Sequence, residues 1–200
     1  MATQQSAPPT TATEIADPAP LGLAGFAMTT FVLSCFNANL LDAKLGLVVL
    51  PLALVYGGLA QLLAGMWEFR KGNTFGATAF SSFGAFWLAY YFLVKDVVPA
   101  LATNPDLHKA LGLFLLAWAI FTAYMAVAAV RVSLAVLAVF VLLTVTFAVL
   151  SAGAFGPSDT TTKIGGWLGL VTAVVAWYAS FAGVTAYTFK RQILPTWPAR

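Results

Sequence analysis

Polar side chains recur at helical spacing inside long apolar stretches of this sequence. Within residues 18–41, Phe26, Thr30, Ser34 and Asn37 follow one another at steps of four, four and three. Such steps place side chains on one face of a helix. Hydroxyl and amide groups on one face can hydrogen-bond a passing solute, so the pattern predicts part of a transport path. Ser and Thr also let membrane helices approach and bond one another, and this packing role stays open for each residue.

Three further stretches carry comparable stripes. An amide in lipid is costly unless it is paired, which makes Asn37 and Gln61 the best candidates to face water or a solute. Gly57, Gly58 and Gly65 are predicted to be packing positions rather than ligands. The additional stripes are Gly57, Gln61, Gly65 and Glu68; Thr74, Thr78, Ser81 and Ser82, beside Phe83; and Thr172, Ala176, Ser180 and Gly183.

Glu68 is the one charged member of the stripes and begins the segment Glu68-Phe69-Arg70-Lys71. One interpretation is an interfacial carboxylate that pairs with Arg70 or Lys71. The other is a titratable group at the inner mouth that takes part in proton-linked movement. Both interpretations stay open from the sequence.

Chemistry of other kinds is not expected. The single histidine, His108, follows one aspartate in a loop, and a catalytic zinc ion needs three protein ligands. Ser81-Ser82 lacks the flanking glycines of a nucleophile elbow. The one cysteine, Cys35, lies in an apolar run and is predicted to be a packing residue. We therefore predict no enzyme activity, no metal and no cofactor.

The elements that must position these side chains follow from the distribution of charge. Only 8% of the residues are Asp, Glu, Lys or Arg, whereas soluble domains carry about a quarter. About 20 apolar residues cross a bilayer as a helix, which satisfies its own backbone hydrogen bonds. We predict an all-α integral membrane protein, a bundle of six transmembrane helices with a pore through each protomer. The charge-free stretches are 18–41, 45–67, 72–94, 110–130, 132–158 and 164–189.

The remaining segments are short. Residues 1–16 are predicted to be a disordered tail, 17–189 the membrane domain, and 190–200 a short cytoplasmic tail. With both termini inside, the inner joints hold six basic residues and the outer joints four, which favours a cytoplasmic N-terminus and C-terminus in the plasma membrane. The net charge of +3 is too small and too scattered for a nucleic-acid partner.

Several blocks of the sequence resemble the acetate uptake transporters, also known as acetate–succinate permeases. Residues 17–26, Asp-Pro-Ala-Pro-Leu-Gly-Leu-Ala-Gly-Phe, are similar to the family signature Asn-Pro-Ala-Pro-Leu-Gly-Leu. Residues 56–68 and 72–87 agree over longer blocks, and Gly166-Trp167-Leu168-Gly169 matches as well. The resemblance extends over residues 17–194.

The resemblance implies a six-helix protomer with its own pore, assembled as a homo-hexamer, that moves acetate and in several members succinate or other short carboxylates. Its aromatic–leucine constriction matches Phe26, Phe83 and Leu143, and a position that affects substrate size matches Ala176. The chain departs from the family at Asp17, where Asn is usual. It departs again at Phe83, where many members have Tyr. Asp17 would add a charge at the mouth, and Phe83 leaves the constriction wholly apolar.

A carboxylate solute raises a physical problem, because none of the six charge-free stretches supplies a cation. Moving a bare carboxylate into low dielectric costs several kcal/mol or more unless it is paired or hydrogen-bonded. We favour a proton-linked route in which the acid crosses the constriction protonated; transfer of the anion between hydroxyl and amide groups is the other solution. Two other functions stay open: a channel for a neutral solute such as ammonia or urea, and a membrane scaffold that transports nothing.

Overall fold

The computed structural model describes residues 15–199. Most of the predicted tail, residues 1–14, lies outside the described residues, as does Arg200. The described chain is helical, apart from an isolated β-bridge between Ser133 and Pro198. Six of its helical stretches are long and apolar enough to cross a membrane, which confirms the predicted bundle.

Two of the six spans are irregular. In the second, a 3-10 turn and a short α-helix lead into a π-turn before the last helix begins. In the third, a π-turn precedes the final α-helical turn. The elements are α1 (Ala19–Asn37); η1 (Ala43–Val48), α2 (Val49–Leu54), η2 (Val55–Ala60) and α3 (Gln61–Lys71); α4 (Thr74–Phe92), η3 (Leu93–Val97) and α5 (Val98–Ala100); α6 (Leu107–Ala129); α7 (Leu134–Phe155); and α8 (Asp159–Thr188).

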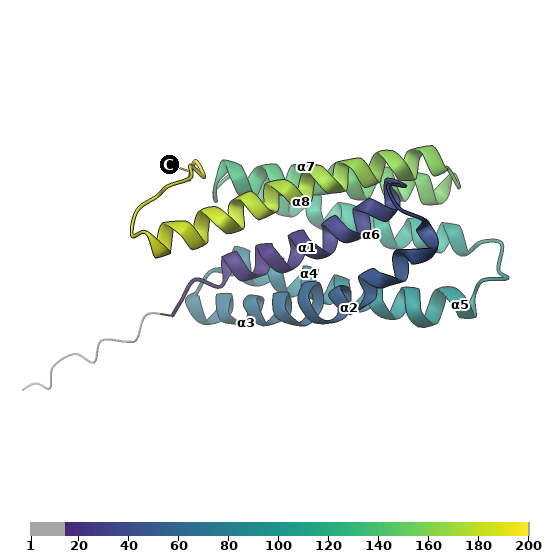
Figure 1. Ribbon diagram of the computed structural model, residues 1–200, viewed down its shortest axis with the longest axis horizontal. Helices are drawn as coiled ribbons and strands as arrows, with labels where there is room; N and C mark the ends of the chain where they lie inside the picture. Colours follow the sequence, from purple (N-terminus) through teal and green to yellow (C-terminus); the bar gives the residue numbers. More distant parts are fainter. Residues whose placement is uncertain (1–14, 200) are drawn as a thin grey trace, which may run out of the picture.

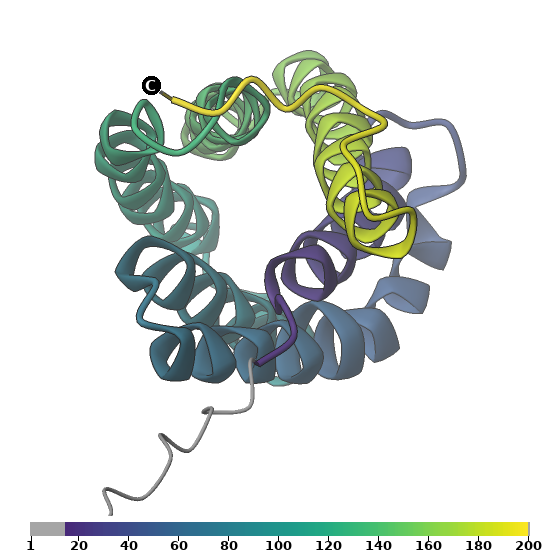
Figure 2. The same ribbon diagram turned by 90° about the vertical axis from the view of Figure 1, so that its left-hand side faces the viewer.

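The helices run side by side along the long axis, and the two described ends of the chain lie at the same end of the bundle (Figure 1). Viewed end on, they form a ring (Figure 2). Neighbours in the ring include α1 with α8, α8 with α7, α7 with α6, and α3 with α4. Between α4 and α6, aromatic side chains close the ring: the Trp118 ring centroid lies 5.9 Å from that of Phe83 and 5.1 Å from that of Phe86.

Short polar residues set the helix ends. Asn73 accepts a hydrogen bond from the Gly76 amide at 3.1 Å, and Ser133 accepts one from the Val136 amide at 3.2 Å. A side-chain acceptor at this position satisfies one of the free amides of a helical first turn. Gly72 ends α3 in the left-handed conformation, with φ of 80°, which glycine adopts without strain.

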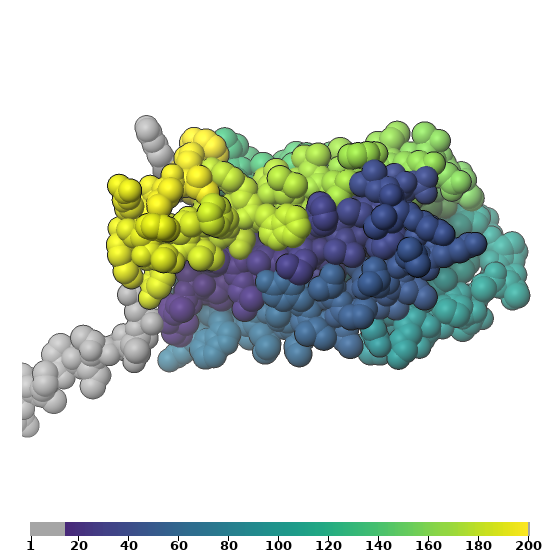
Figure 3. Space-filling view, in the orientation of Figure 1, coloured from purple at the N-terminus to yellow at the C-terminus, as the bar shows by residue number. Residues whose placement is uncertain are grey.

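Lipid is the expected solvent for the outer faces of the bundle. Leu113, Ile120 and Val127 on α6 are each more than 60% exposed, at steps of seven residues along one helix face. A soluble monomer rarely shows such a continuous apolar surface. In the space-filling view α1 lies as a narrow strip between α8 and the α2–α3 segment (Figure 3).

The contact between α1 and α8 requires a glycine. A Cβ atom at Gly166 would overlap the Ala38 amide nitrogen and would lie 2.5 Å from the carbonyl carbon of Asn37. These are backbone atoms, which cannot move aside as a flexible side chain can. Small residues at such positions let two membrane helices approach closely.

Gly166→Ala is therefore expected to push α8 away from the end of α1. The reduced packing should lower the free energy of unfolding by about 1–3 kcal/mol, which thermal unfolding in detergent measures. Gly46→Ala is the matched control, because its Cβ would meet its nearest atom at an ordinary 3.7 Å. Equal melting temperatures for the two variants would contradict the close-packing argument.

Candidate transport path

A small cavity of about 20 Å³ lies midway along the bundle, where Phe26, Phe83 and Leu143 come together. The Phe26 and Phe83 ring centroids are 5.7 Å apart, and that of Phe140 lies 6.0 Å from Phe83. Each of the three residues that the family resemblance assigns to the constriction is at most 4% exposed. The remaining lining residues are Leu23, Gln61, Ala79, Phe80, Val139 and Phe140.

The volume of this cavity limits what it can hold. One water molecule needs roughly 10–15 Å³ of such space, so the cavity is about the size of one water. Acetate has four heavy atoms and requires the rings or Leu143 to move. Among the nine lining residues, Gln61 alone has a polar side chain. The constriction is therefore neutral, almost dry and closed to a carboxylate in this conformation.

Two larger cavities flank the constriction. The inner cavity, named for the end that holds the chain termini, has about 300 Å³ and shares Leu23 with the constriction. The outer cavity has about 290 Å³ and is lined by Asn37, Thr162, Tyr90 and apolar residues that include Phe86 and Phe147. Along α7, lining residues of the inner cavity lie within 135–136, those of the constriction within 139–143, and those of the outer cavity within 147–154. The three cavities thus follow one another along the bundle.

One face of α1 connects the constriction to the outer cavity. Leu23 and Phe26 line the constriction, and Leu33 and Asn37 line the outer cavity. Thr30 lies between them on the same face, because the steps 23, 26, 30, 33 and 37 alternate between three and four. Its hydroxyl is buried and has no hydrogen-bond partner in the described part of the chain. Thr30 is thus placed to bond a solute between the two cavities.

A π-turn places Gln61 at the constriction. Gln61 directly follows η2, and its backbone amide donates to the carbonyls of Tyr56 and Gly58. π-turns add a residue to a helical turn and are frequent at functional sites. Gly57 lets the turn pack closely against Thr29 of α1, since a Cβ atom at Gly57 would lie 2.5 Å from Thr29 Oγ1. The Gln61 side chain is 1% exposed, and its Oε1 finds no partner among the described residues.

Several residues predicted to line the path lie elsewhere. Ser34 packs against Gly169 of α8, and Leu33 takes its place on the path. Ala176 is fully buried in the hydrophobic core. Thr78 and Ser82 are half-buried and line none of the three axial cavities.

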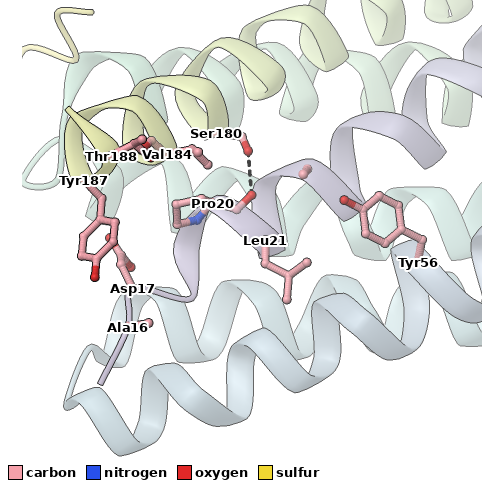
Figure 4. A pocket seen from close by; sticks show the side chains of 11 residues that line it. Ala16, Asp17, Pro20, Leu21, Tyr56, Ser180, Val184, Tyr187 and Thr188 are labelled. Carbon is pink, nitrogen blue, oxygen red and sulfur yellow. Dashed lines mark hydrogen bonds between the residues drawn. The ribbon is translucent and has the colours of Figure 1, made fainter. Parts of the chain in front are cut away.

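Ser180 lies on a lateral cavity of about 430 Å³ between α1 and α8, which shares Asp17, Pro20 and Gly183 with the inner cavity (Figure 4). Its hydroxyl donates to the Pro20 carbonyl at 2.7 Å. The bond ties α8 to the start of α1, so Ser180 serves helix packing in this conformation. Asp17, Leu21, Tyr56 and Tyr187 also line this lateral cavity.

The two predicted mouth carboxylates have different surroundings. Asp17 is half-exposed and forms an ion pair with Lys71 at 2.8 Å, and it also accepts from the Ala19 amide at 3.1 Å. The pair neutralises the charge that Asp17 adds at the mouth. Glu68 is fully buried against Gly76, and neither of its carboxyl oxygens has a partner among the described residues. The predicted pairing of Glu68 with Arg70 or Lys71 is not seen in this part of the chain.

The pattern of the GPR1/FUN34/yaaH family matches residues 1–198. The chain belongs to this family. It is 38% identical to the succinate-acetate/proton symporter SatP of Escherichia coli K12 over 92% of this chain and 96% of SatP. It is 42% identical to acetate permease A of Emericella nidulans, over 92% of this chain and 66% of that protein.

A solved structure titled as the bacterial acetate channel SatP superposes with a TM-score of 0.84 at 37% identity, covering 92% of this chain and 99% of that one. Ammonia transport outward protein 2 of Saccharomyces cerevisiae is 45% identical over 86% of this chain. The chain spans only 62% of the length of that yeast relative. The functional names among these relatives are those of transport proteins, which confirms the expectation that the chain is not an enzyme.

Several lining residues were not predicted from the sequence, although their spacing from the predicted constriction residues indicates them. Leu23 and Phe80 each precede a predicted constriction residue by three positions, and Ala79 and Val139 precede one by four. One turn along a helix returns to the same face. Extending each constriction position by one turn would have found them. The inner-cavity residues Gln192 and Thr196 gave no such signal, because they follow the last helix.

Gln61→Leu is expected to separate function from stability. The Gln61 Oε1 has no partner to lose, so the melting temperature should stay equal or rise. A solute crossing the constriction would lose its only polar contact there, and flux of labelled acetate in proteoliposomes should fall roughly tenfold or more. Leu63→Met, an exposed position on the same helix, is the control. Unchanged flux in Gln61→Leu would remove Gln61 from the path.

Proposed function

We propose that this protein carries acetate and other short monocarboxylates, with succinate as a further substrate, across the plasma membrane. The solute passes from the inner cavity through the constriction to the outer cavity, or in reverse. The observation that carries the proposal is the neutral constriction between two larger cavities. The acetate permease and SatP relatives, by their names, support the choice of solute.

The composition of the path favours proton-linked transport. None of the residues that line the three axial cavities is Lys or Arg. A carboxylate at the constriction would have the Gln61 amide as its one polar contact, which is too little to replace its water shell. A carboxylic acid carries no charge and needs only one or two hydrogen bonds. The proton therefore crosses the constriction with the solute, as the symporter name of the SatP relatives also suggests.

Glu68 is the candidate for a proton-exchanging group of the protein. Its carboxyl group lies in α3, seven residues and thus two turns from Gln61 on the same helix face. It is buried, and no ion pair to it is present among the described residues. A buried carboxyl group without a fixed partner can gain or lose a proton without breaking a salt bridge.

Charge at the two ends supports cytoplasmic termini. Among the described residues, the end that holds the termini has five basic residues (Arg70, Lys71, Arg131, Lys190, Arg191), and the other end has four lysines. Every arginine among the described residues belongs to the end that holds the termini. Positive residues accumulate on the cytoplasmic side of membrane proteins. The exposed apolar faces fit lipid or further copies of the chain, and we propose a homo-hexamer as the family resemblance implies.

Purified protein in liposomes tests the function. Uptake of labelled acetate should exceed that of empty liposomes, should increase when the outside is made more acidic, and should make the outside more alkaline. Uptake that ignores an imposed pH gradient and leaves the outside pH unchanged would overturn the proton link. No acetate uptake at all would overturn the proposed solute.

A second candidate solute is ammonia. The constriction cavity is about the size of one water, which ammonia matches, and a relative at 45% identity is named for ammonia transport. Competition by acetate, ammonium and urea in the uptake assay distinguishes the two candidates. If the protein transports ammonia and not acetate, acetate should not reduce the uptake of ammonia. A scaffold without transport would show no uptake of any solute.

Leu143→Ala is expected to widen the constriction. Leu143 is 3% exposed and lies opposite the two phenylalanines, so removal of its branched side chain enlarges the cavity. Lactate flux should rise severalfold relative to acetate flux. Leu142→Ala, the neighbouring half-buried position outside the constriction lining, is the control. An unchanged lactate-to-acetate ratio in Leu143→Ala would contradict the assignment of the constriction.

Glu68→Gln is expected to uncouple the proton. The amide keeps the size of the carboxyl group but cannot titrate. Accumulation of acetate driven by a pH gradient should therefore fall, while exchange of labelled for unlabelled acetate persists. Arg70→Gln, an exposed neighbour, serves as the control. Full gradient-driven accumulation in Glu68→Gln would exclude Glu68 from the proton path.

A further inference from the structure

The segment after α8 does not trail away from the bundle. Residues 191–199, here named the strap, cross from the end of α8 to the start of α7 (Figure 2). The Leu134 amide donates to the Trp197 carbonyl at 2.9 Å, and the Ala135 amide donates to that of Thr196 at 3.3 Å. The Ala199 amide donates back to the Val132 carbonyl at 3.2 Å. Three backbone hydrogen bonds thus hold the end of the strap in place.

A fourth bond fixes its middle. The Tyr178 hydroxyl on α8 donates to the Pro195 carbonyl at 2.6 Å. Within the strap, the Gln192 side-chain amide donates to Thr196 Oγ1 at 3.1 Å and to the Leu194 carbonyl at 3.3 Å. The strap is therefore ordered by the bundle at both of its sides, and its Gln192 and Thr196 side chains are held together.

The strap forms one wall of the inner cavity. Gln192 and Thr196 line this cavity together with residues of α1, α7 and α8. Many of the other lining residues are small or apolar, such as Ala135, Ala179 and Ala182. The cavity reaches the constriction through Leu23, so a solute from this side meets the strap first.

The other polar groups near this cavity are largely occupied. The first four amides of α7 are all bonded: Leu134 and Ala135 to the strap, Val136 to Ser133 Oγ, and Leu137 to the Ser133 carbonyl. They cannot serve a carboxyl group. The Asp17 carboxylate also lines this cavity and would repel an ionised carboxylate, but its charge is paired with Lys71. The Thr196 and Ser133 hydroxyl protons enter no hydrogen bond among the described residues, whereas the two acceptors of the Gln192 amide occupy both of its protons.

We propose that the inner cavity is a carboxyl-binding site, that Thr196 and Ser133 donate its hydrogen bonds, and that Gln192 holds the Thr196 hydroxyl in place. The site rests on the proposed function and adds the place where a short carboxylate, or its acid, is held before it reaches the constriction. The two neutral hydroxyl donors replace part of the water shell of the carboxyl group while its small apolar end faces Ala179 and Ala182. The absence of a cation from the lining keeps the binding weak, as release towards the constriction requires.

Cysteine protection tests this site, because the chain has one native cysteine to remove. In a Cys35→Ser background, Thr196→Cys and Gln192→Cys are labelled in proteoliposomes with an anionic methanethiosulfonate. The reagent is present on both sides of the membrane. Acetate should slow labelling of both variants severalfold, and chloride at equal ionic strength should not. Thr188→Cys is the matched control, because Thr188 lines the lateral cavity and is exposed. Acetate should leave its labelling rate unchanged.

A double variant, Gln192→Leu with Thr196→Val, tests the site without cysteines. It removes donors but leaves the backbone bonds and the Tyr178 bond of the strap. Acetate flux at low concentration should fall threefold to tenfold or so, and flux at saturating acetate should change much less. Tyr178→Phe should instead lower the melting temperature if the strap stabilises the bundle.

Two results would overturn the site. One is that acetate slows the labelling of neither Thr196→Cys nor Gln192→Cys, or slows the labelling of these two variants and of Thr188→Cys equally. The other is flux by the double variant that matches the unaltered protein at every acetate concentration. Either result together with acetate uptake by the unaltered protein rejects this site alone, whereas absence of acetate uptake by the unaltered protein rejects the proposed function itself.

Discussion

Removal of water from the solute at the constriction is the constraint on which the other features of the path depend. Phe26, Phe83 and Leu143 leave room for about one water, and no charged side chain reaches them. A path with a buried cation would hold a carboxylate too firmly to release it, since a buried charge pair is lost only at high cost. A path without any polar group would exclude the acid as well. The single amide of Gln61 lies between these extremes.

The backbone shows how that amide is placed. A regular helix from Val49 to Lys71 would give Gln61 a different rotation relative to the preceding turns. The π-turn η2 shifts that rotation, and Gly57 and Gly58 leave no side chain where the wider turn meets Thr29 and Leu88. The glycines are packing positions, as the sequence indicated. Their packing is nevertheless what sets the position of the polar group at the constriction.

The limits of sequence reasoning follow from the same geometry. Charge-free length predicts membrane spans well, because the thickness of the bilayer fixes it. Helical spacing also predicted the face of α1 that includes Phe26, Thr30 and Asn37. It could not distinguish Ser34 from Leu33, since both lie within one turn and only the position of α8 decides which faces the path. The strap has no periodicity at all, so only folding of the chain reveals that Gln192 and Thr196 lie at the inner cavity.

The ion pair between Asp17 and Lys71 determines which charges are present at the inner mouth of the path. In this chain Lys71 is within 2.8 Å of Asp17 and makes no pair with Glu68, three residues earlier on the same helix. Asp17 therefore neutralises a cation at the inner mouth and leaves the Glu68 carboxyl group without an ion pair. The ion pair thus leaves no unpaired charge on Asp17 at the mouth and no ion pair on Glu68, and both conditions agree with the proposed proton-linked movement of an uncharged acid.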